Sequence, residues 1–325
     1  MKARIATVCQ AGRFYSLVEK NREYVMGLLD LALRQKPDLV CLPEAFTSAS
    51  VDSTSCWDVA ESVYGPTINA AAERAKAGKC YIICPVLTKR NSKVWNSAVI
   101  LDRKGEILGT YDKLHPVTSS SNYTVFEKGI TPGSEAHVFD LDFGRIGIQI
   151  CFDVGFPESW KQLSKKDARI VFWPSAYNGG FPLQVYAYLH HYWIVSSVRS
   201  DRSRIVDPCG RILAETDWHI NVICRDINLD FMVAHYDFNY SIPDKIMERF
   251  PGQVEVRSYM DDAHFLLEPR DNGLTIERLQ SEFKFETTFL YHERHRRAYR
   301  LIHKGKKPRT QKAAHGERPQ YAKEE

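Results

Sequence analysis

Three side chains that could do chemistry each follow a short apolar stretch. Cys151 ends the run 145–151 and is followed by turn residues, and Glu44 comes after residues 37–43. Lys113 follows a third strand-like segment and a turn. An open α/β sheet presents functional groups at the carboxyl ends of its strands. The chain therefore offers a thiol, a carboxylate that could act as acid or base, and a cation at three such ends.

Each of these residues has a simpler explanation when it is taken alone. Most buried cysteines are small core residues, and Cys151 could be one of them. Glu44 could cap a helix or pair with a surface lysine, and Lys113 could be a solvated charge. The occurrence of all three in the same kind of context favours a catalytic group.

The order glutamate, lysine, cysteine along the chain resembles that of the nitrilase superfamily of carbon-nitrogen hydrolases, in its amidase or N-carbamoyl amine amidohydrolase-like branch. The matching segments are Leu-Pro-Glu-Ala-Phe at 42–46, Tyr-Asp-Lys-Leu-His-Pro at 111–116 and Gly-Arg-Ile-Gly-Ile-Gln-Ile-Cys-Phe-Asp at 144–153. Weaker matches lie at 95–105 and 203–215. The resemblance covers about residues 1–270 and implies an α/β fold, a four-layer α-β-β-α sandwich.

The resemblance also implies a role for each residue. Cys151 is expected to attack a carbonyl carbon and form a thioester. Glu44 is expected to take the thiol proton, pass it to the departing amine and then activate water. In water the pKa of a thiol lies roughly four units above that of a carboxyl group, but burial of Glu44 and the Lys113 ammonium are expected to narrow that gap. Lys113 and the backbone N–H of Phe152 are expected to donate to the oxyanion.

A second glutamate often accompanies these residues in the family, between the lysine and the cysteine and close to a Pro-Gly turn. Glu127, in Phe-Glu-Lys-Gly-Ile-Thr-Pro-Gly at 126–133, is the best match. It is expected to orient Lys113 or the substrate amine. Glu135 is the competing candidate, and a surface salt bridge is the alternative for either glutamate.

The residues that follow the cysteine narrow the expected substrate. Relatives that act on carboxylate-bearing substrates often carry an arginine soon after the cysteine, whereas this chain has Gly155, which disfavours omega-amidase and N-carbamoyl amino acid substrates. Cys-Phe-Asp at 151–153 is more similar to the amidase branches than to the nitrilases proper. We therefore expect a small-molecule amide or N-carbamoyl amine. Nitrile hydrolysis, acyl transfer to an amine and a non-enzymatic interaction protein stay open as alternatives.

Substrate-binding residues are expected at the same sheet edge as Cys151. The candidates are Phe46, Phe152, Trp173, Ser175, Tyr177 and Asn178. Relatives generally have an asparagine and a longer loop after the strand that ends at residue 198. The shorter loop here could open the pocket and let Arg199, Arg202 or Arg204 receive an anionic substrate, and a charged hairpin tip is the alternative.

Alternating apolar runs and amphipathic segments predict sheets that are covered by helices. Strands are expected at residues 4–9, 39–42, 80–85, 98–101, 137–141, 146–150, 170–173, 194–198, 204–206 and 222–227. Helices are expected at about residues 15–35 and 67–76, and after Pro157. No nucleotide-binding glycine loop and no His-Glu-x-x-His motif occurs in the sequence, so neither a cofactor nor a metal is expected.

The charge of the chain is unevenly distributed. Residues 294–325 contain eleven lysines and arginines against three glutamates, a net charge of +8, while the 325 residues together carry +4. No Gly/Ser/Pro linker divides the chain, so residues 1–270 are expected to form one hydrolase domain. Residues 271–303 would form an extension at a subunit interface, and residues 304–325 a flexible basic tail. That tail could instead bind a polyanion, an acidic partner or another subunit.

The remaining observations concern location and partners. The apolar stretch at the N-terminus is too short for a signal peptide or a membrane span, and the eight cysteines form no close paired framework. A cytoplasmic protein with reduced thiols and no membrane partner is therefore expected. A nucleic-acid partner is not expected, because the basic tail lacks interleaved aromatic residues and a binding motif. The family resemblance implies a homo-oligomer, a dimer or larger, in which residues 283–302 could reach across the interface.

Overall fold

The computed structural model describes residues 2–270 and 273–308, which divide into two units between Leu229 and Asp230. The sequence favoured one domain through residue 270, so the division falls earlier than expected. The sequence does not signal it, because strand β12 (Val222–Asn228) is followed after three residues by β13 (Met232–His235) without a linker. The predicted basic tail lies outside the described residues beyond position 308.

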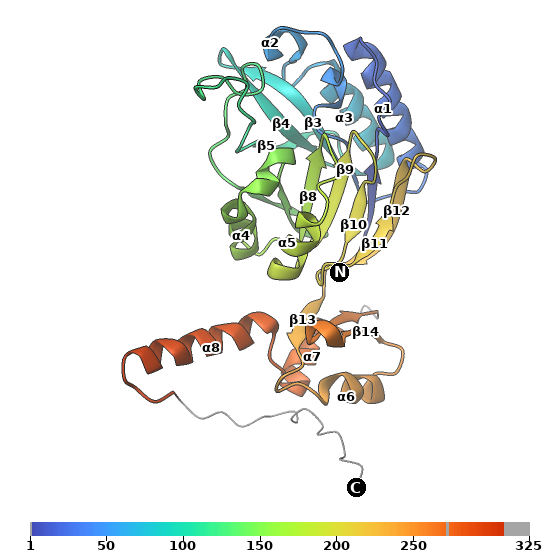
Figure 1. The fold of residues 1–325 in the computed structure, drawn as a ribbon. Coiled ribbons are helices and arrows are strands. Elements are labelled where there is room, and N and C mark those ends of the chain that lie inside the picture. The colour runs from blue at the N-terminus through green and yellow to red at the C-terminus, as the bar shows by residue number, and fades with distance from the viewer. Residues whose placement is uncertain (1, 271–272, 309–325) are drawn as a thin grey trace. The chain divides into compact units, whose positions relative to one another are not determined.

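Two six-stranded sheets form the first unit (Figure 1). In spatial order, one sheet contains β12, β1 (Lys2–Val8), β2 (Leu39–Cys41), β3 (Tyr81–Arg90), β4 (Lys93–Leu101) and β5 (Ile107–Asp112). The other contains β11 (Ile212–Glu215), β10 (Arg204–Val206), β9 (Trp193–Val198), β8 (Ile170–Ser175), β7 (Gly144–Ile148) and β6 (Val138–Leu141). Strands β1, β2 and β3 are parallel, and so are β7, β8 and β9. The carboxyl ends of each parallel set therefore meet at one edge of their sheet.

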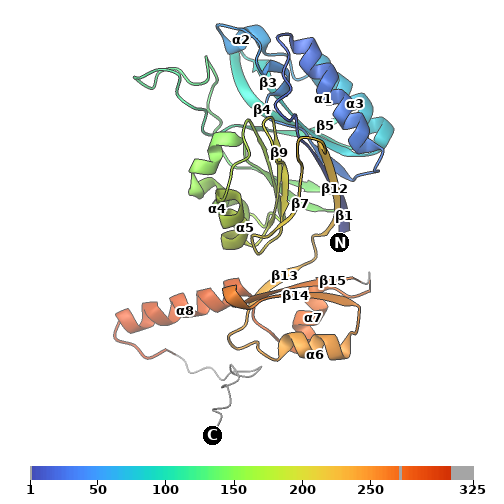
Figure 2. The same ribbon diagram turned by 45° about the vertical axis from the view of Figure 1, so that its right-hand side comes forward.

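Helices cover the outer face of each sheet (Figures 1 and 2). The first sheet carries α1 (Val18–Leu33) and α3 (Pro66–Gly78), and the second carries α4 (Pro157–Lys165) and α5 (Pro182–His190). Val25 and Leu29 of α1 belong to one buried apolar cluster with strands of the first sheet. Trp160, Leu163 and Leu183 of α4 and α5 form another with the second sheet. These layers confirm the predicted four-layer α-β-β-α sandwich.

Small hydroxyl side chains on β1 and β9 join the two sheets at the strand ends. The Thr7 hydroxyl donates to the Ser196 carbonyl oxygen at 2.6 Å. The Ser197 hydroxyl lies 2.7 Å from the carbonyl oxygen of Val8 and 3.0 Å from that of Cys41. These bonds are buried, so they hold the ends of β1, β2 and β9 against one another. The end of β2, which leads into the segment at 42–46, therefore lies beside the second sheet.

All ten strands with predicted bounds are present, most with shifted ends. The segment before Lys113, expected to be a strand but given no bounds, is β5, whereas β11 escaped prediction. Strand β11 is mostly exposed, and β5 is only partly buried, so neither has a strong apolar pattern. Gly109 interrupts β5, and the ring of Phe139 occupies the space that a side chain would need: a Cβ at Gly109 would lie 2.6 Å from it. Phe139 can pack this closely against β5 because Gly109 has no side chain.

The second unit is a smaller α+β element with its own apolar cluster. Its antiparallel sheet has the order β13, β15 (His264–Pro269), β14 (Val254–Tyr259). Its helices are α6 (Ile242–Arg249), α7 (Ile276–Phe283) and α8 (Thr288–His303). In the part of the chain that the structure describes, no helix has the length and apolarity needed to cross a bilayer.

Candidate active site

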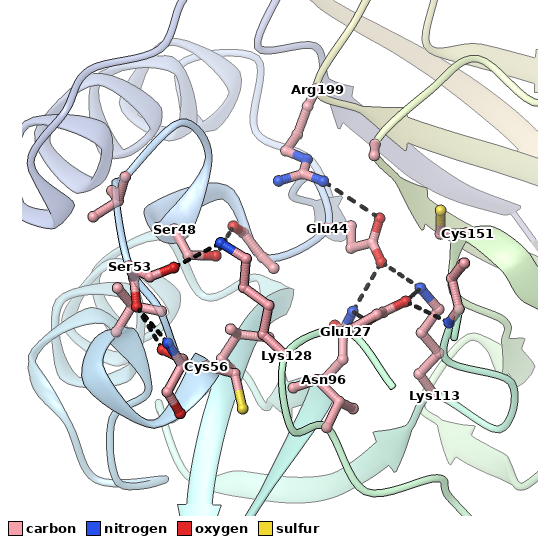
Figure 3. A pocket seen from close by; sticks show the side chains of 18 residues that line it. Glu44, Ser48, Ser53, Cys56, Asn96, Lys113, Glu127, Lys128, Cys151 and Arg199 are labelled. Carbon is pink, nitrogen blue, oxygen red and sulfur yellow. Dashed lines mark hydrogen bonds and ion pairs between the residues drawn. The ribbon is translucent and has the colours of Figure 1, made fainter. Parts of the chain in front are cut away.

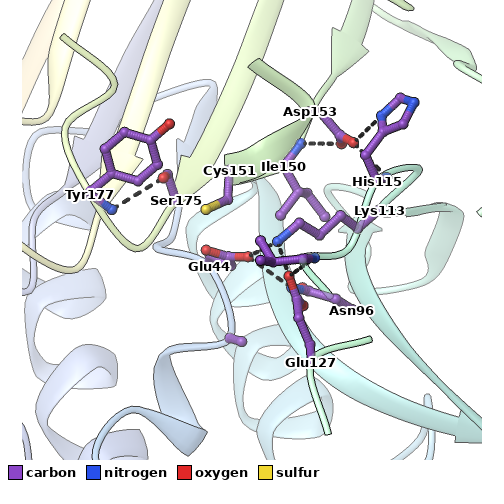
Figure 4. A network of polar contacts seen from close by, with 12 residues as sticks. Glu44, Asn96, Lys113, His115, Glu127, Ile150, Cys151, Asp153, Ser175 and Tyr177 are labelled. Atoms are coloured by element: carbon purple, nitrogen blue, oxygen red, sulfur yellow. Dashed lines mark hydrogen bonds and ion pairs between the residues drawn. The ribbon is translucent and has the colours of Figure 1, made fainter. Parts of the chain in front are cut away.

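Cys151 lies three residues after the end of β7, in a backbone conformation that few residues adopt. Its φ angle is +48°, and a short 3-10 helix, η2 (Cys151–Gly155), begins there. A left-handed conformation at a non-glycine residue costs on the order of 1–3 kcal/mol and is concentrated at functional sites. The Trp173 indole N–H donates to the Cys151 carbonyl oxygen at 3.1 Å. The turn directs the sulfur toward Glu44 (Figure 4).

Lys113 follows β5 and is held between two carboxylates. Its ammonium donates to Glu44 Oε1 at 2.9 Å and to Glu127 Oε1 at 2.6 Å. Lys113 is 1% exposed and Glu44 3% exposed, so the pair is removed from water. Asn96 of β4 also donates to Glu44 Oε1, at 2.8 Å (Figure 4). The structure therefore brings Glu44, Lys113 and Glu127 into one network beside Cys151.

The second oxygen of Glu44 has a different environment. Glu44 Oε2 is buried and accepts no hydrogen bond from the described residues. Nη2 of Arg199 is the nearby cation, at 3.9 Å, too far for a hydrogen bond. A buried carboxylate oxygen without a donor is costly and calls for an explanation. An oxygen that is kept free of donors can accept a proton.

The ionisation states of Cys151 and Glu44 differ from those expected from the sequence. Burial, followed by the negative charge of Glu44, raises the pKa of the Cys151 thiol to about 12, although Lys113, Ser175 and the Ala176 amide act in the opposite direction. Burial also opposes ionisation of Glu44, but Lys113 and Arg199 outweigh it and the pKa of Glu44 is lowered. The predicted narrowing of the pKa gap is therefore wrong. The resting site holds a neutral thiol and a carboxylate.

Lys113 explains this outcome through its contacts. Burial would lower the pKa of the ammonium, but the charges of Glu44, Cys151 and Glu127 raise it. The ammonium stays protonated, and its hydrogen bonds go to the two carboxylates. The lysine therefore stabilises carboxylate charge more strongly than thiolate charge.

Asp153 connects the cysteine turn with the lysine segment. It is fully buried and accepts from the Ile150 N–H at 2.8 Å and the Tyr111 hydroxyl at 2.7 Å. It also accepts from the His115 N–H at 2.9 Å, and the His115 ring nitrogen Nδ1 lies 2.8 Å away (Figure 4). Tyr111 and His115 flank Lys113 in sequence, so one carboxylate fixes the position of Cys151 relative to Lys113.

A cavity of about 420 Å³ opens onto these residues (Figure 3). Such a volume suits a small molecule. Its polar lining includes Glu44, Asn96, Lys113, Glu127, Lys128, Cys151 and Arg199. Its apolar walls include Val51, Val59, Leu87, Val117 and Ile130. Among the described residues, no group of three or more His, Cys, Asp or Glu side chains is arranged to hold a metal ion.

The six predicted substrate-binding residues are not part of that lining. Phe46 is fully buried in the core between α1 and the first sheet, and Trp173 is buried in the cluster under α5. Ser175 is buried and Tyr177 is 43% exposed, and the Tyr177 N–H donates to the Ser175 hydroxyl. Phe152 is 40% exposed and directly follows Cys151. Asn178 donates to Asp201 at 3.3 Å.

The structure separates the competing charged candidates. Glu135 is exposed and pairs with Lys166, whereas the ion-pair partners of Lys113 are Glu44 and Glu127. Arg202 is largely exposed and pairs with Asp201 at 3.0 Å, and Arg204 pairs with Glu215. Glu135 and Arg202 therefore satisfy the surface or hairpin interpretation, whereas Arg204 is a buried residue of β10 that is paired with Glu215. Of the three arginines named from the sequence, Arg199 is the one in the cavity lining.

Sequence reasoning did not select Asn96 or the loop at 48–59 as parts of the site. Asn96 lies in the Trp-Asn-Ser-Ala segment, and a polar residue in the middle of a mostly apolar strand was the available signal. The loop supplies Ser48, Ser53 and Cys56 to the lining. Its sequence carries no pattern that would place it over a strand end.

Two sheets between helical layers, with charged groups and a thiol at the strand ends, define a nitrilase-type fold. The chain belongs to the carbon-nitrogen hydrolase family, whose model matches residues 5–235. The predicted resemblance is thereby confirmed. Family membership supports hydrolase activity on a small molecule.

Individual relatives agree with this assignment. Nitrilase homolog 2 of Dictyostelium discoideum is 29% identical over 237 residues, which are 65% of this chain and 71% of that protein. Omega-amidase NIT3 of Saccharomyces cerevisiae is 24% identical over 272 residues, 74% of this chain and 91% of that protein. Deaminated glutathione amidase of Dictyostelium discoideum is 26% identical over 245 residues, 66% of this chain and 84% of that protein.

Solved structures share the fold. The crystal structure of Saccharomyces cerevisiae Nit3, a member of branch 10 of the nitrilase superfamily, has a TM-score of 0.60 at 19% identity and covers 77% of this chain and 95% of that chain. An amidase from Nesterenkonia sp. has a TM-score of 0.61 at 20% identity and covers 69% of this chain and 89% of that chain. At these identities the likeness establishes the architecture.

Proposed function

We propose that the protein hydrolyses a non-peptide carbon–nitrogen bond, in an amide or an N-carbamoyl amine, through a thioester on Cys151. The observation that carries the proposal is the buried Glu44–Lys113–Glu127 network, which lies beside a strained cysteine at the wall of a small-molecule cavity. The relatives named as amidases support the reaction class.

In the first step, the Cys151 sulfur attacks the carbonyl carbon and its proton moves to Glu44 Oε2. The thiol pKa of about 12 and the lowered pKa of Glu44 make a free thiolate unfavourable in the resting site. Proton transfer therefore accompanies carbon–sulfur bond formation, as the developing negative charge passes to the carbonyl oxygen. Glu44 then protonates the nitrogen, the carbon–nitrogen bond breaks and the amine or ammonia leaves.

Lys113 stabilises the oxyanion that forms in this step. An ammonium has three N–H donors, and two of them are held by Glu44 and Glu127. The third can donate to the oxyanion, together with the backbone N–H of Phe152. One such donor is worth roughly 3–4 kcal/mol of transition-state stabilisation in hydrolases.

Hydrolysis of the thioester completes the cycle. Glu44, ionised again after proton donation, takes a proton from water, and the hydroxide equivalent attacks the thioester carbon. The carbon–sulfur bond breaks, the proton returns to sulfur, and the acid product leaves. Glu127 keeps Lys113 in place throughout, because its Oε1 also accepts from the Val117 N–H at 3.0 Å.

The test is product release from a panel of amides, N-carbamoyl amines and nitriles, with intact mass spectrometry for the acyl-enzyme. Wild type should release ammonia or amine from one class and show an adduct on Cys151. Cys151→Ala and Glu44→Gln should abolish turnover, the second with the thiol still present. Cys224→Ala is the matched control, since Cys224 is half-buried on β12 and lies outside the cavity.

Each alternative predicts a different result. Product formation that depends on an added amine would establish acyl transfer instead of hydrolysis. Turnover confined to nitriles would move the protein to another branch of the reaction class. A folded wild type that gives neither product nor adduct with any class would contradict the proposal and favour an interaction protein.

A further inference from the structure

Arg199 is presented to the cavity from a rigid position. It directly follows β9, its backbone N–H donates to the Ser175 carbonyl oxygen at 2.9 Å, and its own carbonyl oxygen accepts from Gly12 at 2.8 Å. These bonds attach it to strand β8 and to the segment after β1. The guanidinium belongs to the cavity lining and points toward Glu44 (Figure 3).

The guanidinium of Arg199 is the available cation of this cavity. Its contact within the described residues is the long one to Glu44 Oε2, at 3.9 Å, and its side chain is 22% exposed. The other two lining cations are engaged, since Lys113 donates to Glu44 and Glu127, and Lys128 donates to the Ser53 carbonyl oxygen at 2.6 Å. A guanidinium carries five donors in a planar fork that fits a carboxylate.

The charge balance of the lining also favours an anionic ligand. Lys113, Lys128 and Arg199 stand against Glu44 and Glu127, which leaves one positive charge when the two carboxylates are ionised. A ligand with a single negative charge would neutralise the site. A ligand with an ammonium group would increase the positive charge of the cavity and would leave Arg199 without an anionic partner.

We propose that Arg199 is a specificity-determining residue that binds a carboxylate of the substrate, so that the cavity selects short amides or N-carbamoyl compounds bearing one carboxylate. The inference rests on the proposed function for the reacting end of the substrate. Because the cavity holds about 420 Å³ and Arg199 lies 3.9 Å from Glu44, only a short chain fits between the scissile carbonyl and the carboxylate. Gly155 disfavoured such substrates in the sequence, but Arg199 supplies the cation from a different strand end.

The decisive experiment compares matched substrates in wild type, Arg199→Gln and Arg202→Gln. The substrates are the monoamides of straight-chain diacids from malonate to adipate, their neutral methyl esters, and the corresponding aminoalkyl amides. In wild type, kcat/KM for the best monoamide should exceed that for its ester by at least about tenfold, mainly through KM. Arg199→Gln should reduce that ratio to near one. Arg202→Gln should keep it, because Arg202 is outside the cavity lining.

Direct binding separates this inference from the proposed reaction. Isothermal titration of the same monoamides into Cys151→Ala, with and without Arg199→Gln, measures recognition without turnover. Absence of hydrolysis in wild type, with binding that is lost in Arg199→Gln, would sink the reaction and leave the carboxylate site standing. Hydrolysis with equal rates for acid and ester, or a change in Arg199→Gln that is uniform across all three substrate types, would overturn the carboxylate site.

Discussion

At the scale of single residues, the site separates charge so that Glu44 has one oxygen for binding and one for proton transfer. Oε1 accepts from Lys113 and Asn96, and Oε2 accepts no hydrogen bond from the described residues. Burial opposes the ionisation of Glu44, and the nearby cations and the Asn96 amide outweigh it, so its pKa is lowered. The carboxylate is therefore retained to lower pH than that of an ordinary glutamate.

This arrangement predicts the direction of a pH effect. Activity should be lost on acidification as pH falls through the lowered pKa of Glu44, because the protonated acid cannot take the thiol proton. Asn96→Ala removes a donor that lowers that pKa, so the acid limb of the kcat/KM profile should move to higher pH. Asn69→Ala, an exposed residue of α3 that bonds Tyr64, should leave the profile unchanged. An unshifted limb in Asn96→Ala would show that Glu44 does not set it.

The second prediction concerns Lys113 and separates its contribution to stability from its contribution to activity. Lys113→Met leaves two carboxylates facing each other without their cation, which should cost about 3–5 kcal/mol of unfolding free energy and lower kcat by at least about 100-fold. Adding Glu127→Gln should recover part of the stability, because it removes one of the two unpaired negative charges. It should not recover the activity. Urea unfolding and steady-state kinetics measure both.

The control for this pair is Lys166→Met, whose lysine pairs with the exposed Glu135. An exposed pair contributes about 1 kcal/mol or less, so that variant should behave as wild type in both assays. Equal losses in the two lysine variants would contradict a special role for the buried network.

At the scale of elements, Asp153 joins the turn after β7 to the segment after β5. Asp153→Asn replaces one accepting oxygen with an amide that faces donors, which should cost about 1–3 kcal/mol for each buried group left unpaired. We expect kcat to fall at least about tenfold with KM little changed, since the turn shifts without altering the cavity walls. Asp140→Asn, at an exposed carboxylate that pairs with Arg145, is the control on the neighbouring strand. An unchanged kcat in Asp153→Asn would remove Asp153 as a positioning residue.

The same scale explains what the sequence could predict. Glu44, Lys113 and Cys151 each stand in an ordered segment at the end of a strand, so local pattern and family resemblance were sufficient to place them together. Arg199 was named from the sequence together with Arg202 and Arg204, and only the tertiary arrangement separates it from them. Asn96 lies on β4, in a hairpin with β3, and its place in the site depends on contacts with Glu44 and Glu127, which are distant in sequence.

Nearness in sequence was also a poor guide to the cavity walls. Phe46 is two residues from Glu44, yet it packs into the core beneath α1, because the 3-10 turn at Phe46–Ser48 directs it there. Much of the wall comes instead from the segment at 48–59, which includes helix α2 (Cys56–Val59) and whose position depends on tertiary contacts such as the bond from the Cys56 N–H to the Lys128 carbonyl oxygen. The sequence did not reveal the boundary between the two units, at β12 and β13, because both units contribute apolar strands there.

At the scale of the whole molecule, helix α8 carries apolar surface that its own unit does not cover. Leu290, Tyr299 and Ile302 are 52%, 54% and 55% exposed, respectively. Tyr299 and Ile302 lie about one helical turn apart and so share a face of α8, and a contiguous exposed apolar patch commonly marks an interaction site. The family resemblance predicts a homo-oligomer with residues 283–302 at the interface, and this face of α8 is the part of that segment to test.

The last prediction tests that interface in the full chain. Wild type should elute as a dimer or larger in size-exclusion chromatography with light scattering at micromolar concentration. Tyr299→Ser with Ile302→Ser should raise the dissociation constant at least tenfold, because even about 1 kcal/mol from each buried side chain is lost. Trp218→Ser, at a residue 66% exposed in the hydrolase unit, controls for removal of apolar surface in general. A chain ending at Pro308 should assemble as wild type if helix α8, and not the basic tail, makes the contact, whereas a monomeric product would assign assembly to the tail.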